Sequence, residues 1–378
     1  MRVTVFHLMP WQYATDEVAW PFSEDSYDAA LGSELYQTYL DQLEFAAELG
    51  FDSIGLNEHH FTAFGLDPSP NLLAAQLAHR TDDVDITVYG NVLPIRGHPI
   101  RVAEELAMLD NLTEGRLISG FVRGIPSEYA AYGVDPNESR ARFAEAWDLI
   151  VRAWTEPEPF DFHGEYFSYD DVYIWPRPYQ DPHPPLRMPA ESEKSIQYAA
   201  ERRVPIGRVF VGTESLASTY DRYREIAETE YGWEPGPEHF ASNRPVYVAE
   251  TMERAREEAE EHLRYFYETL LGGVFKAGAV RAVGDTEYRE ENAFAYEEAA
   301  PDKGQQAMNF DFEAYQERGE IIVGDPSYVA GELESQYEAT GGFGELIGLF
   351  QFGTLPDELT RKNLELFADE VMPEIRDL

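Results

Sequence analysis

The stretch ELYQTYLDQLEFAAELGFDSIGLNEHHFTAFG, residues 34–65, contains the unit from which we predict the fold. In residues 34–50 the apolar side chains recur at a spacing near 3.6 and the run stops at Gly50, a pattern typical of a helix with a C-terminal glycine. Residues 51–58 follow at once as a short apolar run typical of a strand. A helix that leads directly into a strand indicates a parallel sheet when the pattern repeats.

The pattern repeats along most of the 378 residues. Eight strands are predicted, each followed by a helical pattern, at residues 2–8, 51–58, 84–95, 115–124, 187–191, 206–211, 244–250 and 345–353. Eight such pairs favour a (β/α)8 TIM barrel, an α/β fold in one domain over residues 1–378, with an open sheet as the alternative. The phosphate motifs G-x-G-x-x-G and G-x-x-x-x-G-K-[ST] are absent.

One segment, residues 272–323, interrupts the alternation. It is too long for an ordinary connection between a helix and a strand, and it mixes glycine, aromatic and acidic residues. We expect this insertion to form a lid over a site. A surface insertion without a role in the site is the alternative.

The charge of the chain is strongly one-sided. Asp and Glu number 71 against 29 Lys and Arg, which gives a formal net charge of -42, yet 43% of the residues are hydrophobic. A folded core covered by carboxylates repels itself unless salt screens the charges, so we predict a halophilic protein. Ordinary acidity is the alternative. Nucleic acid and anionic membrane surfaces are excluded as expected partners, because both carry negative charge.

Two features that the sequence lacks narrow the class of protein further. There is no cysteine, which excludes disulfides and thiolate chemistry. No apolar run reaches the roughly 18 residues that a membrane-spanning helix needs, and the first ten residues lack the pattern of a secretory signal. We therefore expect a cytoplasmic protein that does not enter the membrane.

The tetrad NEHH, residues 57–60, ends the second predicted strand. In a TIM barrel the active site lies at the carboxyl ends of the strands, and strand alternation directs Asn57 and His59 toward it. Alternation leaves Glu58 and His60 undecided. The tetrad could bind a metal or form a hydrogen-bonded corner, or His59 could act as an acid–base group near neutral pH.

Two further clusters follow the next strands. Arg123 lies between Gly120 and Gly124, where the backbone can approach a ligand closely, and an Arg there suits a phosphate or a carboxylate. Ser192 and Ser195 begin a helix, whose free N–H groups can bind phosphate. A surface ion pair and simple helix capping are the alternatives. Since both clusters belong to one barrel mouth, we favour a phosphate pocket.

These residues form part of a wider resemblance. EHHFTAFG, VLPIRGHPIRVAEELAMLDNLTEGRL, RGIPSEYAAYGVDPNESR, AES followed by AAERRVP, and LELFADEVMP occur in this order along the chain. Together they resemble the bacterial luciferase-like flavin monooxygenases, in particular the luciferase α subunit. The resemblance runs from the first strand to the last helix and is hard to follow only over residues 272–323.

The resemblance implies a TIM barrel that binds reduced FMN. His59 matches the catalytic His near the flavin C4a–peroxide, and Glu58 and His60 match its neighbours. The positions that match the cofactor site are Arg123, Glu191, Ser192 and Ser195 at the phosphate, Glu128 as a nearby carboxylate, and Gly90, which would follow a non-prolyl cis peptide at Tyr89–Gly90.

Two observations qualify the match. Val122 stands where the family has a Cys, so thiol-dependent inactivation is not expected there. Residues 351–356 are an alternative phosphate site, because barrels often bind phosphate after strands seven and eight.

The resemblance also implies a reaction. Reduced FMN from a separate flavin reductase would combine with O2 into a C4a-(hydro)peroxyflavin, which passes one oxygen atom to an aldehyde, a ketone or a similar small substrate. Phe6, Trp11 and Phe61 are candidates for the substrate wall. The alternatives are F420-dependent hydride transfer and a non-catalytic flavin-binding subunit. No metal is expected, and members of the family commonly pair, so a homodimer is expected.

Overall fold

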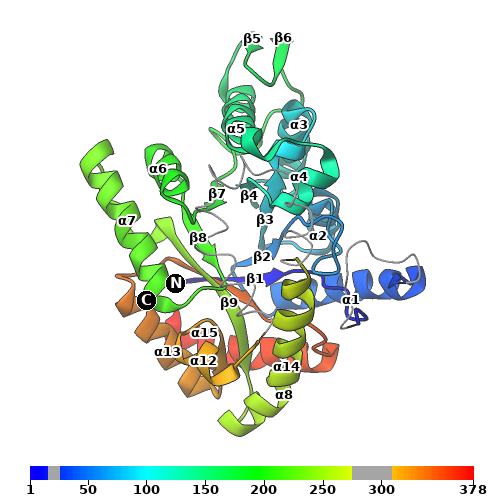
Figure 1. The fold of residues 1–378 in the computed structure, drawn as a ribbon, viewed down its shortest axis with the longest axis vertical. Helices are drawn as coiled ribbons and strands as arrows, with labels where there is room; N and C mark the ends of the chain where they lie inside the picture. Colours follow the sequence, from blue (N-terminus) through cyan, green and yellow to red (C-terminus); the bar gives the residue numbers. More distant parts are fainter. Residues whose placement is uncertain (16–25, 275–308) are drawn as a thin grey trace.

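A closed barrel of eight parallel strands forms the centre of the molecule. The structure is a computed structural model that describes residues 1–15, 26–274 and 309–378. The strands, in chain order, are β1 (Arg2–His7), β2 (Ser53–Leu56), β3 (Asp85–Val92), β4 (Leu117–Val122), β7 (Leu186–Pro189), β8 (Ile206–Val209), β9 (Phe240–Val248) and β11 (Glu345–Leu349). Each pairs with the next, and β11 pairs with β1, which closes the sheet. The predicted TIM barrel is confirmed (Figure 1).

Helices surround the barrel (Figure 1). They are α1 (Ala29–Glu48), α2 (Pro70–Arg80), α3 (Pro99–Leu112), α4 (Pro126–Tyr132), α5 (Ser139–Thr155), α6 (Glu193–Arg202), α7 (Thr213–Tyr231), α8 (Met252–Arg264), α12 (Phe312–Glu317), α13 (Pro326–Ala339), α14 (Asp357–Leu366) and α15 (Met372–Ile375). Several start as the sequence indicates, since proline occupies the first position of α2, α3 and α13, where the missing N–H costs no hydrogen bond.

Strand β9 begins at Phe240, upstream of the predicted start at residue 244, and is buried along its whole length. The polar residues Ser242, Asn243 and Arg244 concealed this start. They are tolerated because partners within the fold take up their polar atoms: Arg244 Nε donates to Ser242 Oγ at 2.9 Å, and its guanidinium donates to the carbonyl of Gly319. A strand buried on both faces by its neighbours need not be apolar at every position.

The described ends of the predicted insertion belong to the barrel wall. After α12, strand β10 (Ile322–Gly324) pairs in parallel with the second half of β9, at Val246–Val248. The expected lid falls largely on residues 275–308, which lie outside the described residues, so it stays a prediction.

The Pro-rich segment between α5 and β7 contains an unforeseen antiparallel hairpin, β5 (Phe160–His163) and β6 (Ser168–Val172). It lies at one end of the molecule beside α5 (Figure 1).

A polar layer crosses the barrel interior. Glu345 Oε1 accepts hydrogen bonds from Thr4 Oγ1 at 2.6 Å and from the Tyr89 hydroxyl at 2.8 Å, and Arg187 Nη2 lies 3.1 Å from Glu345 Oε2. Four strands thus supply one connected group, which compensates a buried carboxylate and fixes their register. Within the described ranges, the helices are all too short or too polar to cross a bilayer.

Candidate functional site

A cavity of about 500 Å3 opens at the carboxyl ends of the barrel strands. Eight of the nine predicted site residues line it: Glu58, His59, Gly90, Arg123, Glu128, Glu191, Ser192 and Ser195. Residues 351–356, the alternative phosphate position, do not line it. Residues that lie far apart in the sequence therefore meet in one cavity because each follows a neighbouring strand.

His59 faces this cavity just beyond the end of β2. Its Nδ1 lies 3.5 Å from Glu128 Oε1, and its ring meets the Phe64 ring edge-on with centroids 5.0 Å apart. Glu128 is almost fully buried in the first turn of α4, where its other oxygen accepts the amide of Ile125 at 2.9 Å. Glu128 therefore stands behind the imidazole, and a proton on Nδ1 would leave Nε2 free as an acceptor.

Glu58 is buried, and three groups compensate its charge. Oε1 lies 2.7 Å from His60 Nε2, while Oε2 accepts from Arg96 Nη2 at 2.5 Å and from the Val92 amide at 3.2 Å. Such contacts offset the cost of a carboxylate without solvent.

His60 turns away from the cavity and is the one predicted site residue that does not line it. Its Nδ1 lies 3.0 Å from the hydroxyl of Tyr132, the last residue of α4. Because His59 faces Glu128 while His60 faces Tyr132, the tetrad does not converge on a common point where a metal could bind. The geometry supports the hydrogen-bonded corner for His60 and leaves His59 as the group exposed to a ligand.

The predicted phosphate cluster also assembles. Arg123 follows β4, and among the described residues it has no carboxylate within ion-pair distance, so the alternative of a surface ion pair does not apply. Ser192 caps α6: the Ser195 amide donates to Ser192 Oγ at 3.3 Å, and the Ser192 amide donates to Ser195 Oγ at 2.9 Å. The predicted capping of α6 is therefore present. Because the cap lies on the cavity wall beside Glu191, the same helix start can both be capped and bind phosphate.

The prediction of a cis peptide at Tyr89–Gly90 is wrong. The cis peptides among the described residues are Trp175–Pro176 and Asp181–Pro182, both prolyl. Strand β3 instead shows a shift of register against β4 between Val88 and Asn91, as a β-bulge produces.

Gly90 is nevertheless required by close packing. A Cβ at Gly90 would lie 3.1 Å from the backbone nitrogen of Glu58.

Sequence reasoning missed several residues of this region. Arg96 and Tyr132 are not in the predicted set, because Arg96 lies in a loop and α4 is a seven-residue helix. The signals available for α4 were the proline at its first position and Glu128 three residues after its cap.

Of the three expected substrate-wall residues, only Phe6 lines the cavity. Phe61 is half exposed, and Trp11 is buried against Tyr13 instead, with ring centroids 5.2 Å apart.

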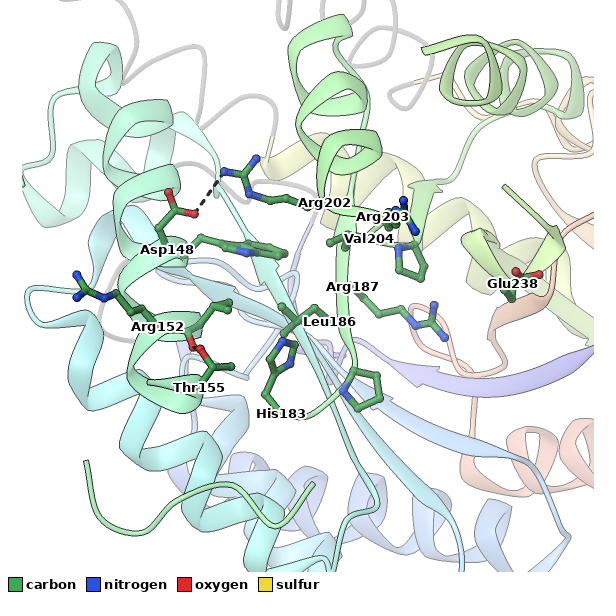
Figure 2. A pocket seen from close by; sticks show the side chains of 14 residues that line it. Asp148, Arg152, Thr155, His183, Leu186, Arg187, Arg202, Arg203, Val204 and Glu238 are labelled. Atoms are coloured by element: carbon green, nitrogen blue, oxygen red, sulfur yellow. Dashed lines mark hydrogen bonds and ion pairs between the residues drawn. The ribbon is translucent and has the colours of Figure 1, made fainter. Parts of the chain in front are cut away.

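A second cavity, of about 590 Å3, lies at the opposite ends of the strands, between α5 and α6 (Figure 2). It contains none of the predicted site residues, and its cations do not converge. Arg202 turns to Asp148 at 3.3 Å, and Arg152 points away from the other labelled side chains (Figure 2). The predicted site residues therefore belong to the first cavity and not to the second.

Comparison with known proteins decides the family. Residues 20–342 match the model of the luciferase-like monooxygenases. The chain belongs to the luciferase-like monooxygenase family. The resemblance inferred from the sequence motifs is thereby confirmed, and the protein is an oxidoreductase of this family.

Curated relatives of this luciferase-like monooxygenase include oxygenases. The alkanal monooxygenase alpha chain of Photorhabdus luminescens is 26% identical over 340 residues, 87% of this chain and 89% of that one. The oxygenase component of the flavin-dependent trigonelline monooxygenase of Acinetobacter baylyi is 27% identical over 357 residues, 92% and 91% of the two chains. An uncharacterized protein of Sinorhizobium fredii is 34% identical over 173 residues, and this chain spans 50% of its length.

Solved structures share the whole fold. Monooxygenase RslO1 from Streptomyces bottropensis is 26% identical with a TM-score of 0.76, covering 99% of both chains. The oxygenating constituent of 3,6-diketocamphane monooxygenase from Pseudomonas putida, in complex with FMN, is 21% identical with a TM-score of 0.77, covering 99% of both chains. An F420-dependent secondary alcohol dehydrogenase is 19% identical with a TM-score of 0.73, covering 100% of this chain and 99% of that one. The last two likenesses concern the fold alone.

Proposed function

We propose that this luciferase-like monooxygenase uses reduced FMN and O2 to insert one oxygen atom into a small aldehyde or ketone. The observation that carries the proposal is that His59, backed by Glu128, lines the same cavity as Arg123 and the start of α6. An acid–base group and an anion-binding corner in one cavity suit a phosphorylated cofactor beside a reacting group. The relatives named alkanal monooxygenase and flavin-dependent oxygenase support the same reaction class.

The residues present fit FMN. Arg123, which has no acidic partner among the described residues, and the start of α6 at Ser192 and Ser195 would hold the phosphate. Asn57 lines the cavity with both atoms of its amide group unpartnered in the described structure, which is the condition expected of a group that awaits a ligand. When bound, reduced FMN supplies the electrons that activate O2.

The chain itself contributes proton handling and exclusion of water. Glu128 Oε1 lies 3.5 Å from Nδ1 of His59, and neither atom has a hydrogen-bond partner among the described residues, so a small approach of the two would fix a proton on Nδ1 and leave Nε2 to take up or deliver one proton. The surrounding wall is largely apolar, and its aromatic members include Phe6, Phe64 and Phe210. Such a wall keeps water from the reacting atoms and so limits unproductive loss of reducing equivalents.

A separate flavin reductase would supply the reduced cofactor, since the chain has neither of the two glycine-rich nucleotide motifs. One relative is itself named as the oxygenase component of its enzyme, which supports a two-protein arrangement. F420-dependent hydride transfer and a non-catalytic flavin-binding role are the competing outcomes of the test below.

The test is anaerobic loading with reduced FMN in about 1 M KCl, followed by rapid mixing with O2. We expect saturable binding and a transient absorbing species that outlives the reoxidation of free reduced FMN. Replacement of His59 by Ala should leave FMN affinity nearly unchanged and slow oxygen transfer by about 10²–10⁴-fold. His79, exposed on α2, gives the matched control His79→Ala, which should behave as the parent.

The outcomes separate the alternatives. Binding of F420 with hydride transfer, and no binding of FMN, would replace the oxygenase proposal. FMN binding without a long-lived species in the parent would indicate a non-catalytic flavin-binding protein. Undiminished oxygen transfer in His59→Ala would remove the role given to His59.

A further inference from the structure

A chain of hydrogen bonds leads from the surface to the cavity wall. Tyr132 is 46% exposed, and its hydroxyl lies 3.0 Å from Nδ1 of His60, which is buried. His60 Nε2 lies 2.7 Å from Oε1 of Glu58, which is also buried and lines the cavity. Tyr132 on α4 and the two residues that follow β2 therefore connect solvent to a buried carboxylate in the cavity wall through contacts within hydrogen-bonding distance, although the Glu58 side chain itself has no exposed surface.

Each member of this chain is chemically able to pass a proton. A tyrosine hydroxyl both donates and accepts, and an ionised carboxylate only accepts. His60 therefore donates from Nε2 to Glu58 and, when neutral, accepts at Nδ1 from Tyr132. When protonated, it donates to both, so it keeps both contacts in either charge state. Imidazole is the side-chain group best suited to exchange protons near neutral pH.

The surroundings favour transfer over a static contact. The charged and titratable groups near His60 are Glu58 and Tyr132 in contact with it, Arg96 and Asp67 beside Glu58, the preceding His59, and Glu128 at the start of α4. Arg96 bonds Glu58 Oε2 alone, which leaves Oε1 to His60. Burial raises the pKa of the Tyr132 hydroxyl, and the charge of Glu58 adds to this effect, so the hydroxyl keeps its proton at neutral pH.

We propose that Tyr132, His60 and Glu58 form a proton path between solvent and the buried Glu58 carboxylate in the wall of the barrel cavity. The Tyr132 oxygen takes a proton from a hydronium ion or a buffer acid, which is left as water or as the buffer base, while its own hydroxyl proton moves to His60 Nδ1 and gives an imidazolium. The Nε2–H bond then breaks and the proton passes to Glu58 Oε1, leaving a neutral carboxyl group beside a neutral imidazole. Each step moves one proton and no electrons. The inference rests on the proposed function for its purpose, which is to set the charge in the wall of the cavity in which His59 acts.

The chain contains a matched control for this arrangement. Tyr169 and His98 form a second Tyr–His pair, with the hydroxyl also 3.0 Å from Nδ1, but neither residue lines the cavity. Tyr169→Phe therefore removes the same hydrogen bond from a pair that cannot serve the site. Tyr132→Phe removes the hydroxyl and keeps the ring, which packs edge-on against His60 with centroids 5.0 Å apart.

The first experiment measures proton exchange at His60 without any turnover. In protein labelled with ¹⁵N-histidine, we expect the Nε2 proton of His60 to exchange rapidly with water although the residue is buried. Tyr132→Phe should slow this exchange by about tenfold or more, whereas Tyr169→Phe should leave it unchanged. Equal exchange in Tyr132→Phe and the parent would overturn the proton path, whatever reaction the protein catalyses.

The second experiment measures oxygen transfer. Tyr132→Phe should lower the rate, leave FMN affinity unchanged, and make the rate rise with the concentration of imidazole buffer, which replaces the missing donor. His60→Gln, whose amide can donate to Glu58 and accept from Tyr132 but cannot take up a proton near neutral pH, should show the same dependence. A loss that buffer does not restore would indicate a structural role and would contradict the proposal. Failure of FMN or O2 to react with the parent would instead contradict the proposed function, because the exchange measurement stands without it.

Discussion

The three buried acidic residues near the end of β2 differ in the partners that compensate their carboxyl groups. Glu58 has Arg96 and His60 as partners, and Glu128 accepts a backbone amide behind His59. Asp67 has no side-chain partner among the described residues: both of its carboxyl oxygens are buried, and the Ser69 backbone is the one group that lowers its pKa. Burial raises the pKa of the Asp67 carboxyl well above its usual value, and the charge of Glu58 adds to the effect. The raised pKa favours the neutral form of Asp67 in the folded protein.

This state predicts how stability changes with pH. A carboxyl group with a raised pKa in the folded protein contributes its full stability below its ordinary pKa of about 4, and the contribution is lost as the pH rises toward the folded value. Asp67→Asn keeps the shape without the titration. Above about pH 6 we expect the variant to be more stable by about 1–3 kcal/mol, with the difference vanishing near pH 4.

Urea unfolding at constant KCl over this pH range measures the effect. Asp82→Asn, at an exposed position, removes the same charge and serves as the control. Parallel pH profiles for Asp67→Asn and Asp82→Asn would show that Asp67 is ionised in the fold.

At the scale of elements, the strands of the barrel were predictable and its corners were not. Apolar runs identify all eight strands, and the barrel then places His59, Arg123 and Ser192 around one mouth, because residues that follow parallel strands share one end. Arg96 and Tyr132 escaped prediction since their positions depend on contacts across the chain. Tyr132 meets His60 only because α4 folds back over the end of β2, and no local pattern encodes that contact.

The turn between β4 and α4 fixes this corner. Gly124 has a φ of 89°, and a Cβ there would lie 2.5 Å from Val92 Cγ1 and 2.9 Å from Glu128 Oε2. Gly133, at the other end of α4, has a φ of 69° but open space around it. The positive φ favours glycine at both positions, but only at Gly124 is there also no space for a Cβ atom.

Replacement of each glycine by alanine separates the two costs. Gly133→Ala should lose about 1 kcal/mol of unfolding free energy, the usual cost of a left-handed backbone. Gly124→Ala should lose about 1–3 kcal/mol more, because overpacking adds to that cost and displaces Glu128 from His59. Urea unfolding gives the stability, and oxygen transfer should fall only in Gly124→Ala. Equal losses in both variants would show that α4 adjusts without strain.

The whole molecule must hold together against a net charge of -42. Ion pairs relieve part of the repulsion within the described residues, but the acids outnumber the bases by more than two to one across the sequence.

An apolar area is nonetheless exposed on α3 and the segment beside it, where Asn111 donates to the Arg177 carbonyl. We name this area the α3 patch; its exposed residues are Met108, Leu112, Tyr173, Trp175 and Tyr179. An apolar area is where two such acidic chains can approach at low electrostatic cost, so we propose the α3 patch as the interface of the expected homodimer.

Dimerisation should therefore depend on both the α3 patch and salt. In about 1 M KCl, where charges are screened beyond about 3 Å, we expect the parent to sediment as a dimer and Leu112→Asp as a monomer. Ser218→Asp adds the same charge at an exposed position on α7 and should remain dimeric. At about 0.1 M KCl the screening length grows to about 10 Å, so the parent should dissociate and unfold at a lower temperature, as the halophilic prediction requires. A dimer that persists in Leu112→Asp would place the interface elsewhere, and an unfolding temperature that does not change with salt would show that the acidic surface is not a halophilic adaptation.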